Sequence, residues 1–181
     1  KAIIIGLGNI GMGYDYYEDD VILSHSNAIH LHPNYKLVAG VDPVKEKRNL
    51  FESKFKVKAY QSVSGCIKNN TNIDIAAIAV PNDLHLTVFR QIVKHGVKNI
   101  ICEKPMGRNL NDAKKIIEIS NRYRNNVIIN YMRRFDPGIN AIKELFSSDR
   151  FGRINTIRVW YSGNFRNNAS HFIDMSLFFL E

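Results

Sequence analysis

The sequence is poor in cysteine and lacks any long apolar run. Its two cysteines, Cys66 and Cys102, form no C-x-x-C pair, and its six histidines and 17 carboxylates show no metal-ligand spacing such as H-E-x-x-H. No apolar stretch among the 181 residues reaches the length of a transmembrane helix. The first residues predict a strand rather than a secretory signal. We therefore expect no bound metal, no membrane partner and a reducing, cytoplasmic setting.

Negative charge is also scarce. The chain has 25 Lys and Arg against 17 Asp and Glu, which gives a net charge of +8 and a pI near 9.5. A basic chain can bind nucleic acid, but here the cations are spread along the sequence without a basic arm or an interleaved aromatic motif. Attraction of an anionic small molecule explains the charge as well, so we expect no nucleic-acid partner.

The chain opens with an apolar run, Ala2 to Ile5, that predicts a buried parallel strand and ends in the pattern G-x-G-x-x-G. In a dinucleotide-binding turn, the first glycine allows the tight turn, the second lets backbone N–H groups approach a pyrophosphate, and the third lets the next helix pack closely. That helix would also offer unpaired N–H groups to the phosphates. The predicted cofactor-binding residues of this turn are Gly6, Leu7, Gly8, Asn9, Ile10 and Gly11.

Strand and helix patterns alternate as far as residue 130. We predict strands at 36–41, 57–60, 74–80, 98–102 and 127–130, and helices at 24–31, 44–54, 62–68, 84–95 and 110–123. The polar and aromatic segment from Met12 to Val21 is interpreted as a loop inserted before the first helix. Short links between the other elements predict a doubly wound parallel sheet, in which ligands bind beyond the carboxyl ends of the strands. The residues that follow such ends are Asp42, Pro81, Glu103 and Tyr131.

Asp42 stands at the end of the second predicted strand. A carboxylate there can accept hydrogen bonds from the adenosine ribose hydroxyls and repels a 2′-phosphate, which predicts NAD as the cofactor. The pair Asp42-Pro43 could instead cap the next helix. Because Lys45, Lys47 and Arg48 follow closely, NADP stays open as an alternative.

The pattern changes after Asp136-Pro137. Residues 139–146 predict a helix, and residues 152–161 alternate apolar and polar side chains, as in a half-buried antiparallel strand. A lone strand cannot bury its own apolar face. We therefore divide the chain into a dinucleotide-binding domain, residues 1–130, and the truncated start of a second domain, residues 131–181.

The motif Glu103-Lys104-Pro105 follows the fifth predicted strand. Together with the glycine turn and Pro81-Asn82-x-x-His85, it resembles the Gfo/Idh/MocA family of nicotinamide-dependent oxidoreductases. Tyr131-x-Arg133-Arg-Phe-Asp-Pro137 and His171-x-x-Asp174 extend the match over essentially the whole chain, with the Met12 to Val21 loop as an insertion.

The resemblance implies an N-terminal Rossmann domain and a C-terminal α/β domain with an open antiparallel sheet, through which members form homodimers or homotetramers. It also implies oxidation or reduction of a sugar, sugar nucleotide or polyol at one carbon. The Asn-Asn-x-Ser-His stretch, residues 167–171, is similar to the branch found in surface polysaccharide and sugar-nucleotide biosynthesis.

The resemblance also implies roles for single residues. Lys104 would touch the substrate hydroxyl and the nicotinamide ribose, Glu103 would bind that ribose, and His171 would be the active-site histidine. Many members carry an aspartate four residues before that histidine, but here it is Asn167, which cannot take up a proton. Proton transfer would then fall to His171 and Lys104. Further residues assigned to the cofactor groove are Pro81, Asn82, His85 and Arg133.

Each role has a plainer alternative. Lys104 could be a surface lysine, His171 could cap the last helix through Ser170, His85 could lie on a helix surface, and Arg133 and Arg134 could be solvated charges. For the whole protein, the alternatives are a polyol or cyclitol dehydrogenase and a non-catalytic dinucleotide sensor.

Overall fold

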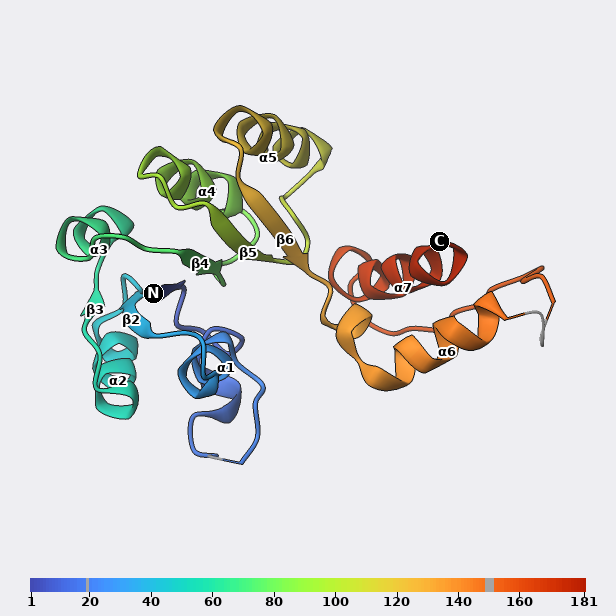
Figure 1. Cartoon of the computed structure of the whole chain (residues 1–181), viewed down its shortest axis with the longest axis horizontal. Helices are drawn as coiled ribbons and strands as arrows, with labels where there is room; N and C mark the ends of the chain where they lie inside the picture. The colour runs from blue at the N-terminus through green and yellow to red at the C-terminus, as the bar shows by residue number, and fades with distance from the viewer. Residues whose placement is uncertain (19, 149–151) are drawn as a thin grey trace. The chain divides into compact units, whose positions relative to one another are not determined.

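The computed structural model describes residues 1–18, 20–148 and 152–181. It contains two compact units, Lys1–Ile129 and Asn130–Glu181 (Figure 1). No helix in these described ranges is long and apolar enough to cross a bilayer. The main helices and strands from the N-terminus to the end of the sheet are β1 (Ala2–Ile5), α1 (His25–Leu31), β2 (Leu37–Val41), α2 (Lys45–Phe55), β3 (Ala59–Tyr60), α3 (Val63–Asn69), β4 (Ile75–Ile78), α4 (His85–Lys94), β5 (Asn99–Glu103), α5 (Leu110–Tyr123) and β6 (Asn126–Asn130).

The strands form one six-stranded sheet in the order β3-β2-β1-β4-β5-β6. The central strand β1 pairs in parallel with β2 on one side and β4 on the other, and β2–β3 and β4–β5 are parallel as well. This confirms the predicted doubly wound sheet. The strand order reverses between β1 and β4, and in such sheets a ligand crevice lies at the carboxyl ends of the strands beside this point.

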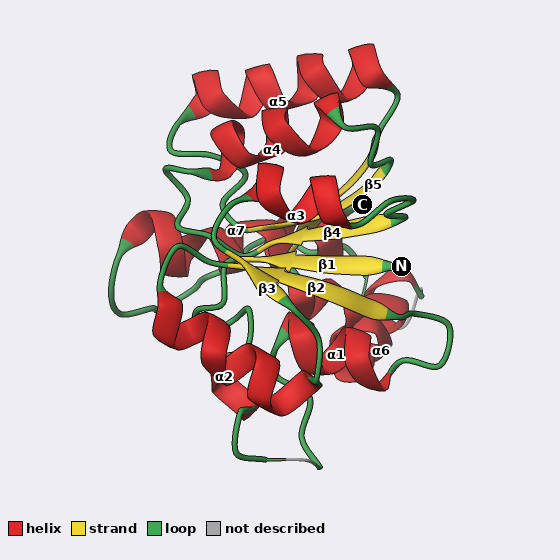
Figure 2. Cartoon of the chain, turned by 90° about the vertical axis from the view of Figure 1, so that its left-hand side faces the viewer, coloured by secondary structure: helices red, strands yellow, loops and turns green. Residues whose placement is uncertain are grey.

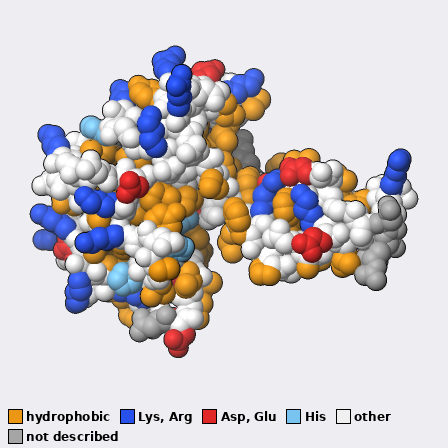
Figure 3. Space-filling model, viewed as in Figure 1, with side chains coloured by type: hydrophobic (Ala, Val, Ile, Leu, Met, Phe, Trp, Pro, Cys, Tyr) orange, Lys and Arg blue, Asp and Glu red, His pale blue; other side chains and the backbone are white. Residues whose placement is uncertain are grey.

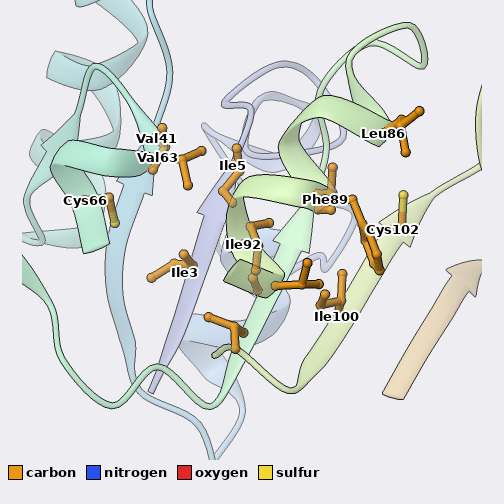
Figure 4. Close-up of a cluster of buried hydrophobic side chains, with 14 of the residues drawn as sticks. Ile3, Ile5, Val41, Val63, Cys66, Leu86, Phe89, Ile92, Ile100 and Cys102 are labelled. Atoms are coloured by element: carbon orange, nitrogen blue, oxygen red, sulfur yellow. The ribbon is translucent and has the colours of Figure 1, made fainter. Parts of the chain in front are cut away.

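Helices cover both faces of the sheet, with α3, α4 and α5 on one face and α1 and α2 on the other (Figure 2). Successive side chains of a strand point to opposite faces, so β1 sends Ile3 and Ile5 into one core and Ile4 into the other. Both faces are therefore dry, which explains why β1 is apolar throughout. The larger cluster lies under α3 and α4 (Figure 4).

Both cysteines belong to this larger cluster. Burial raises the pKa of the Cys66 thiol to about 12. Burial, helped by the neighbouring Glu103 charge, raises the pKa of the Cys102 thiol to about 12 too. Because a thiol needs its thiolate form to act as a nucleophile, both cysteines are core residues and not reactive groups.

The helix after the glycine turn is interrupted by the predicted insertion. The N–H of Met12 donates to the carbonyl of Gly8 (2.8 Å), which closes one helical turn. The helix α1 starts only at His25, whose N–H donates to the carbonyl of Ile10 (3.0 Å), so α1 continues that turn after the intervening residues loop out. Asp19, within the predicted loop, lies outside the described residues.

The insertion is held internally by Asp15, which ends a short 3-10 helix and is 1% exposed. Its Oδ2 accepts hydrogen bonds from the N–H groups of Leu23 (2.7 Å) and Ser24 (2.9 Å). Burial by itself would raise the pKa of Asp15, but the hydrogen bonds from Ser24 and Leu23 outweigh it and hold the pKa below the ordinary carboxyl value.

The insertion is also fastened to α2. The Lys54 ammonium donates to the carbonyl oxygens of Asp15 (2.7 Å) and Tyr16 (2.6 Å). The Tyr16 hydroxyl donates to the carbonyl of Leu50 (3.2 Å). The segment is thus an ordered part of the first unit at these points.

We predict that Asp15→Ala lowers the free energy of unfolding by about 1–3 kcal/mol, because the buried N–H of Ser24 and the partly buried N–H of Leu23 lose their acceptor. Tyr17→Ala, at a 90% exposed position of the same loop, is the control and should change little. Urea unfolding measures both. Since the folded pKa of Asp15 is depressed, its contribution is complete above the unfolded carboxyl pKa of about 3.9 and fades as the pH falls through the lower folded value. An Asp15→Ala protein as stable as wild type at neutral pH would contradict this account.

The second unit contains α6 (Pro137–Ser147) and α7 (Ser170–Leu180). Asp136 caps α6 by accepting hydrogen bonds from the N–H groups of Gly138 (2.8 Å) and Ile139 (3.1 Å). The strand predicted at 152–161 is wrong for this structure, where these residues form no regular element. A strand exists only when its backbone groups pair, and no other strand lies in the described part of this unit beyond the end of β6.

Candidate functional site

Two of the three motif glycines are required by the fold itself. Gly6 has φ +94°, and a Cβ there would lie 2.5 Å from the Ala79 carbonyl oxygen. A Cβ on Gly11 would overlap the carbonyl oxygen of Gly6. Gly8 differs, because a Cβ there would meet nothing within 4 Å. The protein leaves this space open, as a bound pyrophosphate would require.

The backbone N–H groups of Gly8, Asn9 and Ile10 lie in the same turn. In the described part of the chain they donate to no acceptor. They belong to the first helical turn after β1, where backbone N–H groups have no intrahelical partner. Such a cluster binds anions well, so the turn fits the phosphates of a dinucleotide.

Asp42 joins the glycine turn to the end of β2. It is 5% exposed, and its carboxylate accepts hydrogen bonds from the N–H groups of Leu7 (2.9 Å) and Val44 (2.9 Å). The cap residue of α2 is Val44, with no side-chain cap, so the helix-cap alternative for Asp42 is wrong. Arg48 donates to the carbonyl of Asp42 (2.8 Å), so this nearby cation is already engaged with the main chain.

Glu103 ends β5 and contacts a residue that sequence reasoning missed. Its Oε1 lies 2.8 Å from Nε2 of His25, the first residue of α1, and both side chains are about one-tenth exposed. The insertion separates His25 from the glycine motif, so spacing gave no sign of this contact. The pair ties the beginning of α1 to the strand end that carries the Glu-Lys-Pro motif.

His85 is 1% exposed, so the helix-surface alternative is wrong. Its Nδ1 lies 3.0 Å from the Pro105 carbonyl oxygen and its Nε2 lies 2.9 Å from the Val80 carbonyl oxygen. Both ring nitrogens therefore face main-chain carbonyls, and contact between His85 and a cofactor stays a prediction. Lys104, next to Pro105, is half-buried, which excludes a fully solvated surface lysine.

The ends of β4 and β5 present the other predicted groove residues. Pro81 and Asn82 follow β4 and are exposed.

The Lys and Arg side chains are spread over the visible face of the first unit (Figure 3). Among the described residues, no three His, Cys, Asp or Glu side chains are grouped as metal ligands.

In the second unit, two sequence motifs meet. The Arg134 guanidinium donates through Nε to both carboxylate oxygens of Asp174 (3.1 and 2.9 Å), so Arg134 is an ion-paired residue rather than a solvated charge. The rings of Tyr131 and His171 stand edge to face with centroids 6.0 Å apart. Burial raises the pKa of Tyr131, which stays protonated at neutral pH.

Three further predicted residues of this unit lie near the start of α7. Asn167 is exposed, and its carbonyl accepts a hydrogen bond from the Ser170 hydroxyl (3.2 Å). The cap residue of α7 is Ala169 without a side-chain cap, and His171 is half-buried in the first turn. Arg133 is exposed, with its guanidinium 5.4 Å from the Phe172 ring centroid. Their contacts with substrate or cofactor stay predictions.

The Gfo/Idh/MocA model, described as an oxidoreductase family with an NAD-binding Rossmann fold, matches residues 1–131. The rhizopine catabolism protein MocA of Rhizobium meliloti is 26% identical over 150 residues, which cover 78% of this chain and 46% of that protein.

Solved structures show the same fold. The myo-inositol 2-dehydrogenase of Lactobacillus plantarum has a TM-score of 0.82 at 22% identity, over 98% of this chain and 55% of that one. The WlbA dehydrogenase of Bordetella pertussis, solved with NADH and UDP-GlcNAcA, has a TM-score of 0.81 at 21% identity, over 99% of this chain and 57% of that one. This chain spans about half the length of these relatives.

We predict that Gly8→Val abolishes NADH binding, because a branched side chain would fill the open space at the turn. Its unfolding should stay cooperative and close to wild type, since nothing in the protein occupies that space. The control is Gly11→Ala, which should destabilise the fold because its Cβ overlaps a backbone oxygen. Fluorescence titration with NADH and urea unfolding measure the two effects. Unchanged NADH affinity in a folded Gly8→Val protein would contradict the assignment.

Proposed function

Because this chain belongs to the Gfo/Idh/MocA oxidoreductase family with its NAD-binding Rossmann fold, we propose that it transfers hydride between a nicotinamide and a carbon of a sugar or sugar nucleotide. That carbon is a carbinol in one direction of the reaction and a ketone in the other. The observation that carries the proposal is the unfilled space at Gly8, beside three N–H groups without described acceptors. The packing of the protein does not require a glycine at position 8, because a Cβ there would meet no other atom. A bound pyrophosphate would require one, because it would lie close to the backbone.

The cofactor would lie across the carboxyl ends of the strands. The N–H groups of Gly8, Asn9 and Ile10 would receive the pyrophosphate. Each Asp42 oxygen accepts from one backbone N–H, and the Lys47 ammonium lies 3.9 Å from Oδ2. Each oxygen keeps capacity to accept a further hydrogen bond, from an adenosine ribose hydroxyl. Glu103 would accept from the nicotinamide ribose, at a carboxylate already oriented by His25.

Catalysis would need two side chains. NAD, when bound, supplies the hydride acceptor or donor. The Lys104 ammonium would donate a hydrogen bond to the substrate oxygen and stabilise the negative charge that develops there. A ring nitrogen of His171 would take the hydroxyl proton, since a histidine suits proton transfer at neutral pH. Asn167 can orient a hydroxyl but cannot carry the proton.

The substrate class is proposed from two kinds of support. The stretch 167–171 is similar to the branch of surface polysaccharide and sugar-nucleotide biosynthesis, and the Bordetella pertussis relative was solved with a sugar nucleotide. A cyclitol is the second candidate, favoured by relatives named inositol 2-dehydrogenase, one of them 30% identical over 87 residues. Assembly into a homodimer or homotetramer stays a prediction. Incubation with NAD⁺ and a panel of sugars, sugar nucleotides and cyclitols, followed by NADH absorbance, separates these candidates, and NADH binding without any turnover would favour a non-catalytic sensor.

We predict that Lys104→Met lowers the rate of hydride transfer by roughly 10²–10⁴-fold, the usual range for a positioned acid or base. NADH affinity should stay within a few-fold, because the glycine turn and Asp42 are intact. Single-turnover absorbance measures the rate, with Lys94→Met, at an exposed position of α4, as the control. A turnover rate near wild type in Lys104→Met would contradict the proposed catalytic role of Lys104.

We also predict that wild type binds NADH more tightly than NADPH, and that Asp42→Asn narrows this preference. The amide oxygen can still accept from the Leu7 N–H, although the Val44 N–H loses its acceptor, and the neutral amide no longer repels a 2′-phosphate. Glu46→Gln, which removes a carboxylate from the first turn of α2, is the matched control for charge. Tighter binding of NADPH than NADH by wild type would shift the assignment to Lys45, Lys47 or Arg48 as a phosphate contact.

A further inference from the structure

The Glu-Lys-Pro motif is braced on both sides of Lys104 by histidines from other elements. On one side, His25 lies 2.8 Å from the carboxylate of Glu103. On the other side, Nδ1 of His85 lies 3.0 Å from the carbonyl oxygen of Pro105. Lys104 itself is half-buried between these two braces.

His85 does more than fill the core, because its second nitrogen lies 2.9 Å from the Val80 carbonyl oxygen just beyond β4. The ring thus spans the ends of two neighbouring strands, β4 and β5. A carbonyl oxygen only accepts hydrogen bonds, so a neutral ring donates to one of the two carbonyls and a doubly protonated ring donates to both. The ring therefore lies between the two main-chain segments and donates a hydrogen bond to at least one of them.

The rest of the turn after β5 is anchored farther along the chain. Arg108 donates to the Asp112 carboxylate (2.7 Å), and Asn109 caps α5 by accepting from the Asp112 N–H (3.0 Å). Gly107 packs against the same residue, since a Cβ there would lie 2.7 Å from the Asp112 Cβ. These anchors fix residues 107–109 against α5, whereas His85 fixes the segment next to Lys104.

We propose that His85 is a positioning residue, which holds the Pro105 carbonyl near the end of β4 and so fixes the main chain next to Lys104. The catalytic part of this inference rests on the role proposed above for Lys104. A misplacement of about 1 Å in a catalytic group can cost about 10²-fold in rate, so a small shift of the Pro105 main chain is enough to matter.

The test compares three variants by amide hydrogen exchange and by kinetics. His85→Leu removes the hydrogen bonding of the ring at similar size, and His85→Gln keeps an amide that can donate to one carbonyl. Leu86→Ala, at the next buried position of α4, is the control that weakens core packing but keeps the His85 ring. Exchange at Lys104 and Met106, the amides on either side of Pro105, reports on the turn whether or not a substrate is known.

We expect His85→Leu to speed exchange at these amides by at least about tenfold and to lower kcat by about 10–10²-fold. His85→Gln should recover part of both effects, and Leu86→Ala should lower stability without a local effect at the turn. If His85→Leu does not fold, His85→Gln carries the comparison with wild type.

Unchanged exchange at the turn in a folded His85 variant, or an equal change in Leu86→Ala, would overturn the inference and leave His85 a core residue. Faster exchange with an unchanged kcat would overturn its catalytic part. If wild type has no dehydrogenase activity but exchange responds as expected, the proposed function fails while the bracing of the turn stands.

Discussion

The junction after β1 is held by both neighbouring strands, and the rest of the site depends on it. The Gly6 N–H donates to the Val41 carbonyl (2.8 Å), and the Ala79 N–H donates to the Ile5 carbonyl (2.7 Å). The chain leaves the sheet in so narrow a space that a side chain at Gly6 would collide with the backbone beyond β4. The turn that follows, which carries the N–H groups of Gly8, Asn9 and Ile10, therefore starts beside the carboxyl ends of β1 and β4, where ligands bind in doubly wound sheets.

Each strand end around this crevice is fastened to a neighbouring element by a polar side chain. Asp42 fastens β2 to the glycine turn, Glu103 fastens β5 to α1, and His85 fastens the turn after β5 to the end of β4. All three residues are at most 8% exposed, so water competes little for these hydrogen bonds. Such cross-links preorganise a site, because its groups lose little conformational freedom when a ligand arrives.

The strands of the first unit could be predicted because a strand that is buried on both faces has a continuous run of apolar residues. The helices between them could be predicted from their apolar periodicity. The strand predicted at 74–80 contains β4 (Ile75–Ile78), and the helix predicted at 110–123 coincides with α5. Residues 152–161 show the limit of this method. Their alternating pattern is that of a strand, but strand formation depends on a pairing partner that local sequence does not report.

The site could be predicted only in part, for a similar reason. A motif marks residues that follow one another, so the glycine turn and the Glu-Lys-Pro segment were visible. The contact of His25 with Glu103 joins residues 78 positions apart across an insertion, and no spacing rule covers it. The burial of His85 between two carbonyl oxygens likewise depends on the packing of α4 against β4 and β5.

The central claim is that the open turn after β1 binds the pyrophosphate of NAD. Titration of ¹⁵N-labelled protein with NADH tests it most directly, because each backbone N–H reports its own surroundings. The account predicts saturable shifts at the amides of Gly8, Asn9 and Ile10, with the outer face of α5 around Arg122 unchanged. Saturable binding that leaves those three amides unmoved would contradict it.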